Sequence, residues 1–259
     1  MNKRTTTLFD VEGKHILITG AGTGLGRHFA QLLAGLGARV TITGRRLPLL
    51  EQVATTLRDQ GAQVMCVQMD VTLAPCVSQA MSASIEYFGC PDVVICNAGI
   101  AVNGKAEEID QDSWDRAIDT NLKGVWLVSC EAARRMKEAG TGGSIITIAS
   151  ILGLRVAGGV APYSVSKAGV VQLTKQLALE WSRYGIRVNA LAPGYFETEL
   201  NREFFSTEAG QALIRRIPMR RIGSLSELDG PLLLLASGAS QFMTGAVVEI
   251  DGGHLVSGL

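Results

Sequence analysis

The sequence predicts an α/β fold, with a single doubly wound parallel sheet of about seven strands flanked by helices on both faces. Two observations lead to this prediction. Short runs rich in β-branched residues alternate along the chain with longer segments of helical period. The short runs are also almost continuously apolar, which is typical of strands buried on both faces of a parallel sheet. Right-handed crossovers are expected to connect successive strands.

Seven segments are predicted to be strands, in chain order His15–Thr19, Arg39–Thr43, Val64–Met69, Val93–Cys96, Ser144–Ala149, Arg187–Ala192 and Ala246–Ile250. Helical patterns lie between them, near 25–36, 47–60, 73–88, 112–138, 162–184 and 226–237. The segment from Pro193 to about Pro218 interrupts this alternation. Because it is long and polar with interspersed aromatic residues, we expect a lid or binding loop at about 194–216.

Residues 1–10 are polar and lack the apolar stretch of a signal peptide, so they predict a flexible N-terminal arm ahead of a single domain at 11–259. The 259 residues include 24 basic and 24 acidic side chains, and 47% are hydrophobic, which predicts an ordered, soluble chain with a sizeable core. No basic block could follow a nucleic-acid backbone or an anionic membrane, and no apolar run could span a bilayer. We expect neither partner, and a cytoplasmic location.

The five cysteines are Cys66, Cys76, Cys90, Cys96 and Cys130. An odd count without paired CxxC spacing argues against a disulfide framework or a zinc site. Most of them stand in apolar surroundings, which favours buried thiols in the core. The three histidines are scattered, so no metal site is expected.

A glycine-rich turn follows the first strand and opens the first predicted helix, as Gly20-Ala21-Gly22-Thr23-Gly24-Leu25-Gly26. Glycines let the backbone approach a phosphate held at a helix N-terminus. The spacing is TGxxxGxG, and its place between strand and helix favours a dinucleotide phosphate site over an ordinary tight turn.

The second strand ends in Thr43-Gly44-Arg45-Arg46, where a site that prefers NAD usually carries a carboxylate for the ribose hydroxyl. Here two guanidinium groups are available instead. The planar donors of Arg45, with help from Arg46, suit the 2′-phosphate of NADP. The alternative is two solvated loop arginines.

The later strands also end in polar or turn-forming residues: Asp70-Val71, Asn97-Ala98-Gly99, Ser150 and Pro193-Gly194. In open α/β sheets, ligands bind outside the carboxyl ends of the strands. We therefore expect these residues to converge on one site.

Ser150 is followed by Tyr163 and Lys167, which are four residues apart and would share one face of a helix. A nearby ammonium is expected to lower the tyrosine pKa, which suits a general acid/base. Ser150 could donate a hydrogen bond to a substrate oxygen. Taken alone, a tyrosine–lysine pair at this spacing is more often a solvated pair, and its place after Ser150 favours the catalytic interpretation.

This ordered set resembles the short-chain dehydrogenase/reductase family over residues 11–253. The resemblance rests on TGxxxGxG, Asn97-Ala98-Gly99, Asn121, Ser150, Tyr163xxxLys167 and Pro193-Gly194. It implies a Rossmann-type dinucleotide-binding catalytic domain and a homo-oligomer, commonly a tetramer. Where the family commonly has Asn-Asn-Ala-Gly, this chain has Cys96-Asn97-Ala98-Gly99, which leaves the structural role of the first asparagine in doubt.

Carried over by position, the resemblance implies Tyr163 as proton donor or acceptor, with Ser150 polarising the carbonyl. Lys167 would hold the ribose and tune Tyr163, while Asn121 would order a proton-relay water. Thr198 would meet the nicotinamide carboxamide. The cofactor-binding residues implied are Gly20, Thr23, Gly24, Leu25, Gly26, Arg45, Asp70, Val71, Asn97, Ala98, Gly99, Tyr163, Lys167, Pro193, Gly194 and Thr198.

The leading hypothesis is an NADP(H)-dependent oxidoreductase, with NAD(H) also possible, that interconverts a carbonyl and a secondary alcohol. A catalytically silent dinucleotide sensor of the same fold is the alternative, but it need not keep Asn121, Ser150, Tyr163 and Lys167 together. An enoyl reductase would be expected to show a longer tyrosine–lysine spacing.

The substrate stays open at this point. The stretch Ala192–Thr198 is similar both to reductases of sugar acids such as gluconate and to 3-oxoacyl-thioester reductases. Tyr195, Phe196, Phe204 and Phe205 favour an apolar contact, whereas Arg202, Arg215 and Arg216 could meet a carboxylate.

Overall fold

A computed structural model describes residues 8–198 and 202–257 of the chain. Its seven strands form one parallel sheet in the order β3-β2-β1-β4-β5-β6-β7. The strands are β1 (His15–Thr19), β2 (Arg39–Gly44), β3 (Val64–Gln68), β4 (Val93–Cys96), β5 (Gly143–Ile148), β6 (Ile186–Pro193) and β7 (Val247–Ile250). The predicted fold class and all seven predicted strands are confirmed, with small shifts at the ends.

The α-helices are α2 (Gly24–Gly35), α3 (Leu47–Asp59), α4 (Ala74–Phe88), α5 (Gln111–Ile118), α6 (Gly124–Ala139), α7 (Ala161–Trp181), α8 (Arg202–Ser206), α9 (Glu208–Ile214) and α10 (Asp229–Ala236). Short 3-10 turns are η1 (Ala106–Glu108), η3 (Ile151–Gly153), η4 (Ser182–Tyr184), η5 (Leu225–Leu228), η6 (Gly238–Ser240) and η7 (His254–Val256). The helix predicted at 112–138 is interrupted by a π turn, η2 (Asp119–Lys123), which side-chain periodicity alone does not reveal.

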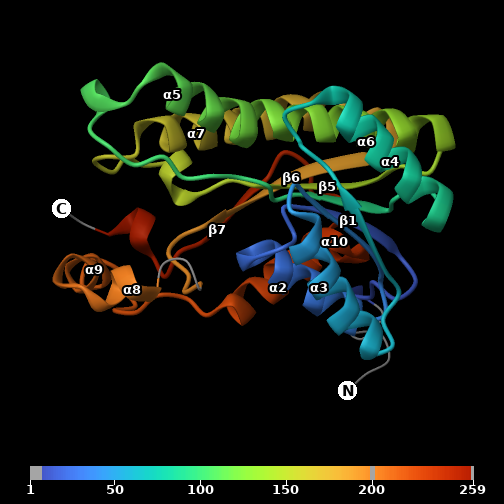
Figure 1. Ribbon diagram of the computed structural model, residues 1–259, viewed down its shortest axis with the longest axis horizontal. Helices are drawn as coiled ribbons and strands as arrows, with labels where there is room; N and C mark the ends of the chain where they lie inside the picture. Colours follow the sequence, from blue (N-terminus) through green and yellow to red (C-terminus); the bar gives the residue numbers. More distant parts are fainter. Residues whose placement is uncertain (1–7, 199–201, 258–259) are drawn as a thin grey trace.

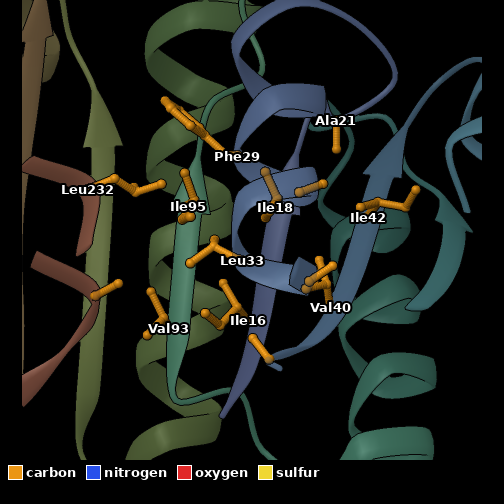
Figure 2. Close-up of a cluster of buried hydrophobic side chains, with 14 of the residues drawn as sticks. Ile16, Ile18, Ala21, Phe29, Leu33, Val40, Ile42, Val93, Ile95 and Leu232 are labelled. Carbon is orange, nitrogen blue, oxygen red and sulfur yellow. The ribbon is translucent and has the colours of Figure 1, made fainter. Parts of the chain in front are cut away.

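Helices cover both faces of the sheet: α4, α5, α6 and α7 lie on one side, and α2, α3 and α10 on the other (Figure 1). Alternate side chains of β1 point to opposite faces of the sheet. Ile16 and Ile18 pack with α2, whereas Leu17 belongs to the core on the other face. Figure 2 shows the first of these cores, where Phe29 and Leu33 of α2 lie over the central strands. This double burial explains why the strands are almost continuously apolar.

The strand order changes direction between β1 and β4, because the chain runs outward to β2 and β3 and then returns to the other side of β1. Loops from the two halves of the sheet diverge at such a switch point and leave a crevice at the carboxyl ends of the strands. The topology therefore places the predicted ligand site between the ends of β1 and β4.

The segment predicted as a lid, 194–216, contains two helices, α8 and α9. We refer to 194–216 as the flap. The start of the flap is hydrogen-bonded to Gly223, which donates its N–H to the Tyr195 carbonyl at 2.9 Å and accepts from the Glu197 N–H at 3.2 Å. A Cβ at Gly210 would lie 2.2 Å from the Phe204 carbonyl oxygen, so this glycine allows α8 and α9 to pack closely.

The five cysteines are free thiols. Of these, Cys96 is fully buried in the core, whereas the other four are half-buried, so the expectation of core thiols holds fully for one of them. In the described part of the chain, no helix combines the length and apolar character needed to cross a bilayer. The predicted arm at 1–10 falls mostly outside the described residues, which begin at Leu8.

Candidate active site

A cavity of about 970 Å³ lies at the carboxyl edge of the sheet, a volume typical of small-molecule and cofactor sites. It brings together residues that follow six of the seven strands. The predicted site residues that line it are Gly20, Thr23, Gly24, Leu25, Arg45, Asp70, Val71, Asn97, Ala98, Gly99, Ser150, Tyr163, Lys167, Pro193, Gly194 and Thr198. Gly26 and Asn121 do not line it.

The glycine turn lies against the end of β4. Gly20 has φ +66, a conformation that glycine adopts readily, and a Cβ there would be 2.8 Å from the Cα of Ala98. At Gly26 a Cβ would lie 2.5 Å from Nδ2 of Asn97. Nδ2 of Asn97 donates to the carbonyls of Thr19 at 2.9 Å and Gly20 at 3.2 Å. Gly26 and Asn97 thus fix the shape of the turn.

The N-terminus of α2 opens onto the cavity through Thr23, Gly24 and Leu25. The first turn of α2 carries no acidic side chain, and the Thr23 hydroxyl does not cap the helix. Main-chain N–H groups and the positive end of the helix dipole are therefore available to an anion. This arrangement fits the pyrophosphate of a dinucleotide.

Arg45 and Arg46 line the same end of the cavity, directly after β2, and both are exposed. Nε2 of Gln68 donates to the Arg45 carbonyl at 2.9 Å, which anchors the main chain of this loop to β3. Among the described residues neither guanidinium forms an ion pair. Both can therefore turn toward a phosphate at the end of the cavity.

The opposite end holds Ser150, Tyr163 and Lys167. Lys167 is only 3% exposed, and its Nζ donates to the Ile148 carbonyl at 2.6 Å and lies 5.6 Å from the centre of the Tyr163 ring. Burial lowers the pKa of Lys167 to about 8. The tyrosine–lysine pair therefore joins a buried ammonium to a half-buried phenol in the cavity wall and is not a solvated pair on a helix surface.

The expected lowering of the Tyr163 pKa is wrong for this structure. Burial raises the pKa of Tyr163 above its ordinary value, and a side-chain hydrogen bond with Ser150 opposes that rise only in part. The physical reason is that the phenolate loses its hydration in the cavity wall, while the ammonium of Lys167 points to a carbonyl of β5. The phenol is thus held protonated at neutral pH.

Asn121 lies in the π turn η2 and is fully buried. Its Oδ1 accepts from the Ile100 N–H at 2.8 Å, while Nδ2 donates to the Ile100 carbonyl at 2.9 Å and to Oγ of Ser166 at 3.1 Å. Both amide protons are thereby used within the protein. The side chain of Asn121 acts on the loop after Gly99, not directly on the cavity.

The structure adds lining residues that the motif analysis did not single out, among them Ile100, Ala101, Leu49 and Thr120. Ile100 and Ala101 directly follow Asn97-Ala98-Gly99, so their place after a strand end was the available signal. Tyr195 and Phe196, noted for their apolar character, also line the cavity. Arg202, Arg215 and Arg216 do not.

Comparisons with known proteins agree with this geometry. A family model described as enoyl-(acyl carrier protein) reductase matches residues 20–254. Gluconate 5-dehydrogenase of Gluconobacter oxydans is 36% identical over 251 residues, covering 96% of this chain and 98% of that protein. Cis-4-hydroxycyclohexanecarboxylate dehydrogenase of Sinomonas cyclohexanicum is 38% identical, covering 92% and 95% respectively.

Among solved structures, a gluconate 5-dehydrogenase from Burkholderia cenocepacia in complex with NADP and tartrate superposes with a TM-score of 0.93 at 36% identity. The match covers 98% of this chain and 100% of that one. Similarity over nearly the whole chain, together with the TGxxxGxG turn and the Ser150–Tyr163–Lys167 cluster, places this protein in the short-chain dehydrogenase/reductase family, as an NAD(P)-dependent oxidoreductase that acts on alcohol and carbonyl groups.

Proposed function

We propose that this protein is an NADP(H)-preferring oxidoreductase in which Tyr163 is the general acid/base for carbonyl reduction and alcohol oxidation. The observation that carries the proposal is the arrangement of one cavity. Its first end combines the glycine turn with Arg45 and Arg46, and its second end combines Ser150, Tyr163 and Lys167. A dinucleotide reaching from one to the other would hold its nicotinamide beside the tyrosine.

The second end provides the groups that a carbonyl reduction needs. Bound NADP(H) supplies or accepts the hydride. Ser150 donates a hydrogen bond to the substrate oxygen, and Tyr163 transfers its phenolic proton to that oxygen as negative charge develops. Because burial keeps the Tyr163 pKa high, the phenol is ready as a proton donor at neutral pH.

Lys167 is proposed to hold the ribose hydroxyls and to support the phenolate after proton transfer. Its place at the cavity wall, with Nζ anchored on Ile148, fits both roles. Asn121 is proposed as a positioning residue. Because its side-chain amide is committed to Ile100 and Ser166, any water-ordering role would rest on its main chain in the π turn, a feature common at functional sites.

The preference for NADP(H) rests on Arg45, with Arg46 in support. Both guanidinium groups are exposed at the end of β2, and neither is neutralised by a carboxylate among the described residues. A charge-assisted contact with a 2′-phosphate would therefore replace only hydration, without breaking an existing ion pair.

A homo-oligomer is proposed from apolar side chains left exposed on one layer of helices. Trp114 of α5, Trp126 of α6, and Val165 and Leu179 of α7 are each more than a third exposed. These helices lie side by side over the same face of the sheet (Figure 1). Large exposed apolar side chains on neighbouring helices are typical of a protein–protein contact, here a second copy of the chain.

The central test is Tyr163→Phe, which removes only the hydroxyl. With NADPH and a panel of ketones, ketoacids and acyl thioesters, we expect turnover to fall at least about 100-fold while NADPH binding is retained. The control is Tyr87→Phe, at an exposed tyrosine outside the cavity, which should leave turnover unchanged. Near-normal turnover by Tyr163→Phe would rule out the mechanism.

A further inference from the structure

We infer that the substrate end of the cavity takes an uncharged, largely apolar ketone or secondary alcohol and rejects a carboxylate such as a sugar acid. This inference rests on the proposed function and narrows its substrate class. The substrate end is the part of the cavity lined by Ile100, Ala101, Ser150, Tyr163, Tyr195 and Phe196. These residues follow β4, β5 and β6, whereas Arg45 and Arg46 follow β2 on the other side of β1.

The lining of the substrate end is hydrocarbon interrupted by neutral hydroxyls. Ile100, Ala101 and Phe196 present apolar surface, and the Tyr195 ring packs edge-on against Phe205 with 6.2 Å between centroids. Burial raises the pKa of Tyr195, so its hydroxyl stays neutral. The polar groups that face a substrate here suit a single oxygen.

None of the three arginines of the flap that the structure describes lines the cavity. Arg202 pairs with Glu197 at 2.6 Å, and the guanidinium lies outside the cavity lining. Arg215 and Arg216 directly follow α9, are exposed and also do not line the cavity. Residues 199–201 are Glu, Leu and Asn in the sequence and add no cation.

The cations of the neighbouring loops do not line the cavity. The charge of Arg155 acts on Tyr195, but its guanidinium donates away from the cavity lining, to the carbonyl of His254 and to Oγ of Ser257, and Lys105 pairs with Glu108 at 2.7 Å. Lys167 lines the cavity beside Tyr163, at the end opposite Arg45 and Arg46, but its Nζ donates to Ile148 and its proposed partners are Tyr163 and the cofactor ribose. Among the described residues, no cation is left at the substrate end to meet a carboxylate.

With no cation at the substrate end, the charge of the substrate should determine how well it binds. A carboxylate that leaves water without gaining a cationic partner loses binding free energy, whereas a methyl group of similar size gains it on an apolar wall. We expect discrimination of about 100-fold or more in kcat/KM between two ketones that differ only in this group. The similar dehydrogenases described above are named for compounds that carry a carboxylate, gluconate and cis-4-hydroxycyclohexanecarboxylate. The lining of this cavity therefore favours a different class of substrate.

The test uses three matched pairs that exchange methyl for carboxylate: 4-methylcyclohexanone and 4-oxocyclohexanecarboxylate, 4-methylacetophenone and 4-acetylbenzoate, and 2-octanone and 7-oxooctanoate. Oxidation of NADPH by the wild-type protein is followed with each. We expect the neutral member of at least one pair to be preferred about 100-fold or more. Equal or better turnover of the carboxylates would overturn the inference while leaving the proposed oxidoreductase function standing.

A gain-of-charge variant makes the test specific to this wall. Ala101→Arg places a guanidinium at the substrate end. It should lower the ratio of kcat/KM for the neutral ketone to kcat/KM for the carboxylate at least about 10-fold. Thr55→Arg adds the same charge on the exposed side of α3, outside the cavity, and should leave the preference unchanged. An unchanged ratio in Ala101→Arg would overturn the assignment of this wall.

Failure of the proposed function gives a different result. If no ketone of any pair oxidises NADPH, the oxidoreductase proposal fails. The inference that the substrate end rejects carboxylates is then tested by the binding of neutral and carboxylate compounds. Calorimetric titration of the matching alcohols and acids into the protein–NADP complex should show the neutral compounds binding more tightly. Tighter binding of the acids, or no binding of any neutral compound, would overturn it.

Discussion

The side-chain amide of Asn121 satisfies both main-chain polar groups of Ile100, accepting from its N–H at 2.8 Å and donating to its carbonyl at 2.9 Å. This reciprocal pair joins the π turn between α5 and α6 to the loop after β4. Because Ile100 lines the end of the cavity proposed to hold the substrate, we expect Asn121 to position a substrate contact that it does not itself make.

Replacing Asn121 by leucine should therefore damage stability and substrate binding together. The part-buried N–H and carbonyl of Ile100 would lose their partners, which costs up to about 1–3 kcal/mol for an unsatisfied group. We expect a lower unfolding free energy in urea and a KM for the ketone raised about 10-fold. The control is Asn189→Leu, at a second fully buried asparagine, which bonds Met243 and Ala246. Asn189→Leu should lose stability without a rise in KM; equal KM values in both variants would contradict the positioning role.

Removing the guanidinium of Arg45 should weaken the binding of NADP(H) much more than the binding of NAD(H). A charge-assisted contact contributes about 1.5–3 kcal/mol, so Arg45→Ala should bind NADP(H) about 10- to 100-fold more weakly and bind NAD(H) nearly as before. Fluorescence titration of both reduced cofactors measures this. Arg116→Ala, at an exposed arginine of α5 outside the cavity, serves as the control. Equal losses for the two cofactors, or tighter NAD(H) binding by the wild type, would refute the 2′-phosphate contact.

The buried ammonium of Lys167 should make the cofactor-free protein less stable at neutral pH. Its pKa falls from 10.5 to about 8 on folding, so the folded state gives up the proton first as pH rises. The penalty is complete below about pH 8, shrinks between pH 8 and 10.5, and is absent above that; by linkage it reaches about 3 kcal/mol.

Urea unfolding of the wild type and Lys167→Met between pH 7 and 10 tests this penalty. The unfolding free energy of the wild type should rise with pH relative to that of the variant, and the variant should be the more stable at pH 7. Lys175→Met, at an exposed lysine of the same helix, should keep the pH dependence of the wild type. Parallel pH profiles for wild type and Lys167→Met would show that Lys167 is not buried as a cation.

The flap is expected to be mobile without ligand and to close over bound cofactor, carrying Thr198 toward the nicotinamide and excluding water. Tyr195 and Phe205, in ring contact, would transmit the closure between the cavity wall and α8. Hydrogen exchange with and without NADP(H) checks this, with α4, which contributes no residue to the cavity lining, as an internal reference. Protection in 194–216 should rise on cofactor addition. Strong protection in both states would favour a rigid helical insertion, for which the close packing of α8 and α9 at Gly210 provides the structural basis.

The sequence by itself determined the sheet and the place of the site. Runs such as Ile16–Ile18 and Val93–Cys96 are apolar without interruption, which is typical of strands that are buried on both faces of a parallel sheet. The turn at Gly20 and the residues at the strand ends were equally readable, because their demands are local: a positive φ, a close approach, or a place after a strand. Parallel connections then bring the strand ends to one edge.

The tertiary structure alone decided how these residues behave chemically. Burial raises the Tyr163 pKa where a neighbouring lysine was expected to lower it, because desolvation depends on everything packed around the phenol. Asn121 is committed to Ile100, and Arg202 to Glu197, through contacts that sequence spacing does not reveal. Burial, proximity and the partner of a charge are properties of distant segments brought together. The amino-acid sequence names the groups that can react, and packing decides which of them meet, which remain charged and which face the substrate.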